Sequence, residues 1–177
     1  MISMPTSSAC SEGPRDVDFD VGANVGQTLS SSRRAWPQSR VVCFEPPSKP
    51  LAELRRLVDA DSLAEAHQIA LSDVEGDLEL HEFEVSAANS LLNPVIDASS
   101  PDFLRLGTIS LVRATTLDAW CSRHSVDKID LLKIDTQGAD GRVLAGADGL
   151  LRAKDRPRVR RGHLRQSLRR AADFREL

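Results

Sequence analysis

Tyrosine is absent from this 177-residue chain, and aromatic residues make up only 4% of it. The absence of tyrosine removes one common catalytic acid or base. The scarcity of aromatic rings leaves few platforms on which unpaired bases stack, so the composition counts against binding of single-stranded nucleic acid. We therefore expect no nucleic-acid partner.

Cysteine and long apolar runs are scarce as well. Cys10, Cys43 and Cys121 are widely separated and form no Cys-x-x-Cys pair, which argues against a disulfide framework. The four histidines include no close pair with the spacing of metal ligands, so we expect no metal site. Residues 1–13 lack the apolar core of a signal peptide, and no segment of the sequence has the length and apolarity of a membrane span. A cytoplasmic location without a membrane partner is the resulting expectation.

The remaining composition is that of a globular protein. The chain is 41% hydrophobic and 28% charged, and its length fits one domain with a sizeable core. The net charge of -3 is unevenly distributed, because residues 156–177 hold eight arginines against two acidic residues. We expect three parts: a disordered leader at 1–15, a folded domain at 16–159, and a basic tail at 160–177 whose leucines recur at helical spacing.

The stretch Asp16–Gln27 predicts a buried strand that runs into a tight turn and then a helix. Apolar and acidic residues alternate over Val17–Val21, which is the period of a strand. Gly22, Asn24 and Gly26 follow, and these residue types tolerate left-handed backbone angles. The helix start beyond them offers free N–H groups and a positive dipole end. Such a turn is typical of a nucleotide-cofactor site.

The spacing in this turn departs from the dinucleotide fingerprint Gly-x-Gly-x-x-Gly. Counted from Gly22, the second and third glycines would fall at Asn24 and Gln27. Asp20 stands before the turn, and its charge suits the ammonium and sulfonium of S-adenosylmethionine better than a pyrophosphate. S-adenosylmethionine is therefore the favoured cofactor, and an ordinary strand-to-helix turn is the alternative.

Strands alternate with helices along the chain, which predicts a parallel sheet with right-handed crossovers. The expected strands lie at 17–21, 40–44, 67–71, 77–83 and 129–134, with one more beginning near 159. The expected helices lie at 24–35, 47–60, 116–124 and 138–151. The polar, turn-rich residues 86–101 are expected to form a loop over the site.

Acidic residues stand at or just past the carboxyl ends of four predicted strands, at Asp20, Glu45, Asp73 and Asp135. Open α/β sheets bind ligands at that edge. Glu45 is placed to accept hydrogen bonds from ribose hydroxyls, and Asp73, next to Ser72, is placed to accept one from an adenine amino group. The alternatives are a solvated strand-end acid for Glu45 and an ordinary turn residue for Asp73.

The strand that ends at Asp135 lies beside the first strand if the strand order is 3-2-1-4-5. Asp135 would then face the Gly22 turn, where it could orient the substrate, act as a base or hold a metal. Lys133 lies two residues earlier on the same strand face and is expected to pair with Asp135 and lower its pKa, or else to reach solvent. Asp135 and Lys133 are the candidate catalytic residues.

Five sequence blocks, in this order, carry a family resemblance: Asp20–Gln27, Val42–Pro46, Ala70–Asp73, Thr116–Asp118 and Leu132–Asp140. Together they resemble the S-adenosylmethionine-dependent methyltransferases of the FkbM family. The resemblance implies a Rossmann-like α/β class I methyltransferase sheet with helices on both faces. It also implies methyl transfer to a hydroxyl of a small molecule or glycan, such as a carbohydrate or a polyketide-type natural product. The candidate cofactor-binding residues are Asp20, Gly22, Asn24, Gly26, Glu45, Ser72 and Asp73, of which the resemblance implies all but the last two.

The sequence departs from the family pattern after Leu151. Family members usually continue with an apolar strand that ends in an acid and then a hairpin, whereas an arginine-rich segment follows here. We expect a truncated or frame-shifted sheet that lacks the last strands and self-associates through an exposed edge. Two other functions stay open: a cofactor-binding relic without turnover, and a nicotinamide-dependent reductase, which the broken glycine fingerprint opposes.

Overall fold

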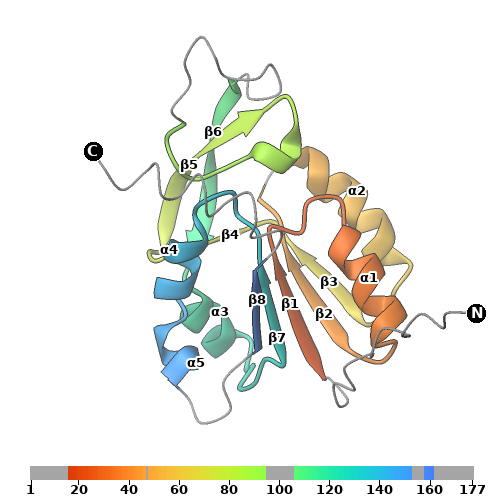
Figure 1. Ribbon diagram of the computed structural model, residues 1–177. Helices are drawn as coiled ribbons and strands as arrows, with labels where there is room; N and C mark the ends of the chain where they lie inside the picture. Colours follow the sequence, from red (N-terminus) through yellow and green to blue (C-terminus); the bar gives the residue numbers. More distant parts are fainter. Residues whose placement is uncertain (1–15, 47, 95–105, 153–157, 162–177) are drawn as a thin grey trace, which may run out of the picture.

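The computed structural model describes residues 16–46, 48–94, 106–152 and 158–161. Helices flank a central parallel sheet, and a smaller sheet stands beyond the carboxyl ends of the central strands (Figure 1). The predicted leader at 1–15 lies outside the described residues, as does most of the predicted tail. Among the described residues, no helix is long and apolar enough to cross a membrane.

The central sheet has five parallel strands in the order β3-β2-β1-β7-β8. These are β3 Ala64–His67, β2 Arg40–Phe44, β1 Val17–Val21, β7 Leu131–Ile134 and β8 Arg158–Arg161. This order confirms the prediction that the strand leading to Asp135 lies beside the first strand. The β1–β7 register places Asp20 opposite Lys133. The carboxyl ends of β1, β2 and β7 therefore meet at one edge.

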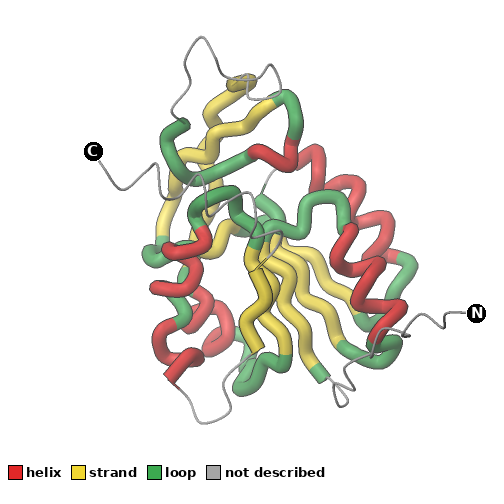
Figure 2. The backbone as a smooth tube through the Cα atoms, viewed as in Figure 1, coloured by secondary structure: helices red, strands yellow, loops and turns green. Residues whose placement is uncertain are grey.

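Helices cover both faces of this sheet (Figure 2). One layer is α1 Gln27–Ala35 and α2 Ser48–Asp59, and the other is α3 Leu117–Arg123, α4 Asp140–Ala145 and α5 Asp148–Arg152. Each face buries its own apolar cluster, because successive strand residues point to opposite sides. Phe19 and Phe44 pack with Trp120 of α3, while Leu29 of α1 and Leu54 of α2 pack on the other face.

The smaller sheet has the order β4-β6-β5. Its strands are β4 Ala70–Leu71, β6 Leu106–Thr115 and β5 Gly76–Phe83, and a 3-10 helix, η1, follows β5 at Ser86–Ala88. The predicted extra strand at 77–83 is confirmed as β5. Strand β6 was not predicted. It pairs antiparallel with β5 along nearly its whole length, so the pairing stabilises a segment whose own pattern is weak.

Three predicted elements differ from the structure. The strand expected at 67–71 is two strands in two sheets, since β3 ends at His67 and β4 begins at Ala70. The helix expected from residue 24 begins at Gln27, because the turn before it is left-handed. The helix expected at 138–151 is interrupted at Gly146, where a Cβ atom would lie only 2.0 Å from the carbonyl oxygen of Ser72.

Strand β8 extends past the predicted domain boundary at residue 159. Arg160 and Arg161 belong to it and align with Lys133 and Ile134 of β7. Both residues therefore belong to the strand that was expected to begin near Val159. Within the described residues, β8 is an edge strand of the central sheet. Residues 162–177, with the predicted helical spacing, lie outside the described residues.

Candidate functional site

The glycine turn after β1 has the left-handed backbone that its sequence predicts. The φ angles are 74° at Gly22, 49° at Asn24 and 90° at Gly26. A Cβ atom on Gly22 would lie 2.1 Å from the carbonyl oxygen of Asp135, so a side chain there is excluded. The amides of Gly22 and Ala23 both donate to the carbonyl of Phe44, at 3.1 and 3.2 Å. The turn is therefore fixed between the ends of β2 and β7.

Glu45 lies at the end of β2, beside this turn. Its side-chain Oε2 accepts a hydrogen bond of 2.7 Å from the backbone N–H of Asn24, and the residue is buried. Burial raises the pKa of Glu45 to about 7, because the charged form loses its hydration there, although the Asn24 hydrogen bond opposes the rise. No hydrogen bond from the described part of the chain reaches the other oxygen, Oε1.

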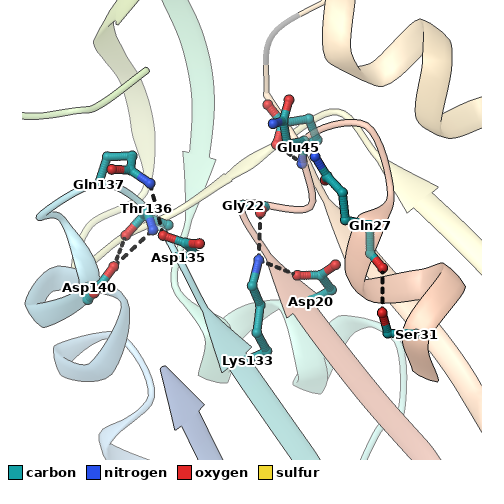
Figure 3. Close-up of polar contacts among 11 residues, drawn as sticks. Asp20, Gly22, Gln27, Ser31, Glu45, Lys133, Asp135, Thr136, Gln137 and Asp140 are labelled. Carbon is teal, nitrogen blue, oxygen red and sulfur yellow. Dashed lines mark hydrogen bonds and ion pairs between the residues drawn. The ribbon is translucent and has the colours of Figure 1, made fainter. Parts of the chain in front are cut away.

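Lys133 does not have the contacts predicted for it. Its ammonium lies 2.7 Å from Oδ1 of Asp20 and donates a 2.8 Å hydrogen bond to the carbonyl oxygen of Gly22 (Figure 3). The side chain is 14% exposed, so the alternative that it reaches solvent is wrong too. The ion pair joins β7 to β1 and holds the first residue of the glycine turn. The expected pairing with Asp135 is replaced by a cross-strand pair with Asp20.

Asp20 is buried beneath the turn. The residue is 1% exposed. Its carboxylate Oδ1 lies 2.7 Å from the ammonium of Lys133, which makes this a buried ion pair. Burial raises the pKa of Asp20, and the neighbouring ammonium of Lys133 counteracts that rise. Asp20 therefore supports the turn from within.

The loop after β7 presents Asp135 beside the glycine turn (Figure 3). The half-buried Asp135 accepts a 2.9 Å hydrogen bond at Oδ1 from the side-chain amide of Gln137. Asp140, at the start of α4, accepts hydrogen bonds from the backbone and the hydroxyl of Thr136 at 2.9 and 2.7 Å. Gln137 and Gly138 have positive φ angles, so this loop too has a fixed and unusual path.

Sequence reasoning missed two serines that connect the loop over the site to both of these turns. The hydroxyl of Ser86 donates to the side-chain oxygen of Asn24 at 3.1 Å. The hydroxyl of Ser90 donates to the carbonyl of Gln137 at 2.9 Å. The polar loop at 86–101 was predicted to lie over the site, but no sequence pattern singled out these two residues.

Ser72 and Asp73 are not brought to the glycine turn by any hydrogen bond among the described residues. Ser72 is buried, its amide donates to Thr115, and its hydroxyl donates to Asp73 at 3.0 Å. Its carbonyl lies against Gly146 at the α4–α5 junction. The side chain of Asp73 is exposed. The adenine role of these two residues remains a prediction.

No group of three or more His, Cys, Asp or Glu side chains within the described ranges is arranged to hold a metal ion. The candidate site instead consists of the glycine turn after β1, the acid Glu45 at the end of β2 and a second acid, Asp135, after β7. A parallel sheet with these features at the carboxyl ends of its strands defines a Rossmann-like cofactor-binding domain.

The comparisons identify the family. The model of the methyltransferase FkbM domain matches residues 20–176, and the chain belongs to that family. The match extends beyond Leu151, where the sequence resemblance was expected to end. A crystal structure of methyltransferase FkbM from Methylobacillus flagellatus KT superimposes with a TM-score of 0.58 at 14% identity, covering 91% of this chain and 36% of that one. At that identity the superposition supports the fold alone.

Two curated relatives carry specific names. The chain is 28% identical over 160 residues to 2-O-methyltransferase NoeI of Sinorhizobium fredii, a match that covers 82% of this chain and 66% of NoeI. It is 28% identical over 169 residues to 31-O-demethyl-FK506 methyltransferase FkbM of Streptomyces tacrolimicus, covering 83% of this chain and 64% of that protein. The chain thus spans about two thirds of the length of these relatives.

Proposed function

We propose that this chain is a methyltransferase that uses S-adenosylmethionine to methylate a hydroxyl of a small molecule or glycan, such as a carbohydrate or a polyketide-type natural product. Family membership supports the reaction class. The names of NoeI and the FK506 methyltransferase, both of which describe O-methylation, support a hydroxyl acceptor. The observation that carries the proposal is the geometry at one sheet edge, where a side-chain-free Gly22 touches the backbone of Asp135 and Glu45 flanks the same turn.

The residues at this edge fit S-adenosylmethionine. Glu45 has one oxygen held by Asn24 and one left to accept from a ribose hydroxyl. Without side chains, Gly22 packs against the backbone of Asp135 and Gly26 packs against Leu57, which gives the turn its close-packed path, and the fingerprint for a pyrophosphate is absent. The cofactor, when bound, supplies a methyl group already activated by its sulfonium, so the protein mainly needs to align and desolvate the reacting groups.

We assign the catalytic contribution to Asp135. Its carboxylate stands beside the glycine turn and is oriented by the amide of Gln137. There it can hold the acceptor hydroxyl in line with the methyl group and take its proton during transfer. Lys133, the other predicted catalytic residue, is instead assigned to positioning, since its ammonium is committed to Asp20 and the carbonyl of Gly22.

Calorimetric titration tests the cofactor part of the proposal. S-adenosylmethionine and S-adenosylhomocysteine are expected to bind, and nicotinamide dinucleotides to bind far more weakly. Tight dinucleotide binding without binding of either sulfur compound would refute it.

A methyl-transfer screen on hydroxylated acceptors tests the reaction. With an acceptor in hand, Asp135→Asn is expected to keep cofactor affinity and lose about 10²–10⁴-fold in turnover, the usual contribution of acid–base catalysis. Turnover at the parental rate would remove Asp135 from its assigned role.

A further inference from the structure

The segment 86–92 is joined by side chains to the two loops that form the proposed site. At one end, the Ser86 hydroxyl bonds to the side-chain oxygen of Asn24 in the glycine turn. At the other end, the Ser90 hydroxyl bonds to the carbonyl of Gln137 in the loop after β7. These contacts join residues 62 and 47 positions apart in the sequence. The segment therefore bridges the loops that follow β1 and β7.

The same segment is held from behind by strand β5. Ser90 and His81 exchange backbone hydrogen bonds of 3.1 and 2.9 Å. The imidazole Nδ1 of His81 lies 3.2 Å from the carbonyl of Leu92, and the buried ring has a fixed position. Asn89 accepts a 2.9 Å hydrogen bond from the amide of Phe83. Strand β5 thus fixes one side of the segment 86–92. The hydrogen bonds of Ser86 and Ser90 fix the position of its other side against the loops of the site.

Each serine contacts a residue that in turn contacts a functional carboxylate. Asn24, the partner of Ser86, donates its backbone N–H to Glu45. Gln137, the partner of Ser90, donates its side-chain amide to Asp135. One chain of contacts thus connects Glu45, the proposed ribose-binding acid, through Asn24 to Ser86. A second connects Ser90 through Gln137 to Asp135, the proposed catalytic acid.

We propose that residues 86–92 form part of the surface that binds the hydroxyl-bearing acceptor, and that Ser86 and Ser90 position this surface in response to the cofactor. The inference rests on the proposed function. A cofactor that engages Glu45 and the glycine turn restricts Asn24, and Asn24 then restricts the segment through Ser86. Because coupling between two sites is reciprocal, loosening the segment also loosens the turn. Each of the two ligands is therefore expected to favour binding of the other.

Hydrogen exchange read by mass spectrometry tests the coupling without a known acceptor. The parent, Ser86→Ala, Ser90→Ala and Ser110→Ala are compared with and without S-adenosylhomocysteine. Ser110→Ala is the matched control, because its hydroxyl donates to Glu82 within the β5–β6 pair and touches neither loop of the site.

In the parent, S-adenosylhomocysteine is expected to slow exchange in residues 86–92 by about fivefold, the lower end of typical coupling between sites. Measured with enough S-adenosylhomocysteine to saturate each variant, Ser86→Ala loses this protection and Ser110→Ala retains it. Equal protection in the parent and Ser86→Ala would overturn the inference, as would bound ligand without any protection of the segment in the parent.

The free protein gives a second readout that separates this inference from the proposed function. Without any ligand, Ser86→Ala is expected to speed exchange in the turn at 22–27, and Ser90→Ala to speed exchange at 135–138, while Ser110→Ala changes neither. Unchanged exchange in both loops would overturn the coupling. If S-adenosylhomocysteine fails to bind the parent, the proposed function fails, and these two comparisons still decide the coupling.

Discussion

Replacing Lys133 with methionine removes the cation that pairs with the buried Asp20. The change deletes an ion pair of 2.7 Å to Asp20 and a hydrogen bond of 2.8 Å to the Gly22 carbonyl, while keeping a side chain of similar length. Breaking a buried pair by removing one partner typically costs about 3–5 kcal/mol, because a charge is left uncompensated. Asp20 is 1% exposed, so water does not replace the lost partner. We expect Lys133→Met to lose about 3 kcal/mol of unfolding free energy at pH 8.

The loss should depend on pH in a defined direction. Burial already raises the pKa of Asp20, and removal of the ammonium raises it further. A carboxyl whose pKa is raised by folding is favoured in its protonated form, so stability falls as pH rises from the unfolded pKa through the folded one. Lys133→Met should therefore be closest to the parent at low pH and diverge as pH increases.

Urea denaturation of the free protein at several pH values measures both effects, and it needs no cofactor. The double variant Asp20→Asn/Lys133→Met removes the stranded charge and should regain about 2 kcal/mol over Lys133→Met at pH 8. Arg113→Met is the control, since its pair with Asp77 is 69% and 60% exposed and such pairs contribute about 0–1 kcal/mol.

Two results would refute this reasoning. One is a Lys133→Met stability within about 0.5 kcal/mol of the parent at pH 8, which is the behaviour of a surface pair. The other is a double variant less stable than Lys133→Met, which would show that the Asp20 charge itself is not the source of the cost. Kinetics of the same variant separate two roles for Lys133. If Lys133→Met binds the cofactor more weakly but keeps its turnover at saturating cofactor, Lys133 positions the glycine turn and does not take part in catalysis.

Two further predictions concern the glycine turn and its acid. Because the pKa of Glu45 is about 7 and the proposed ribose contact needs its ionised form, S-adenosylhomocysteine should bind about tenfold more weakly at pH 6 than at pH 8 by calorimetry. Glu45→Gln should remove this dependence, and a parent without pH dependence would contradict the assignment. Gly22→Ala should cost about 2 kcal/mol or more in thermal or urea unfolding, since its Cβ meets Asp135 and its φ is left-handed. Gly141→Ala, whose Cβ meets no atom within 4 Å, should instead be neutral or stabilising by up to about 1 kcal/mol, and equal losses in the two variants would show that the close approach at Gly22 is unimportant.

Strands β1, β2 and β7 of the central sheet could be predicted from sequence because each has a short apolar or alternating pattern and leads to an acid or a turn. The run Arg40–Phe44 is a strand with the predicted bounds in the structure. Thr116 caps α3 as its residue type predicts, accepting from the amide of Ala119 at 3.1 Å. Strand β6 could not be predicted in the same way. Leu111 in β6 is 74% exposed, so the alternation of apolar and polar residues in this strand does not mark a buried face. Its strand conformation depends on its pairing with β5.

The candidate site was predictable where backbone conformation decides it. Gly22, Asn24 and Gly26 all have the left-handed angles that their residue types favour, and Glu45 lies beside them as its strand-end position predicts. Ser86 contacts this turn from 62 residues away. No local pattern specifies such a contact, because it depends on how the smaller sheet stands over the central one.

The pairing of Lys133 shows how burial decides between two acids that sequence spacing alone cannot rank. Asp135 lies two residues after Lys133 in the sequence, which is why it was the predicted partner of the lysine. It follows the last residue of β7, however, where it is half-buried and in contact with Gln137. Asp20 lies directly across the β1–β7 pair and is almost completely buried. An ammonium gains most beside the carboxylate that has lost the most hydration, since that charge is otherwise the more costly one. The two residues of the Lys-x-Asp spacing therefore have different surroundings: the lysine stabilises the buried acid beneath the glycine turn, and the aspartate stays half-buried at the sheet edge, as its proposed role at the acceptor hydroxyl requires.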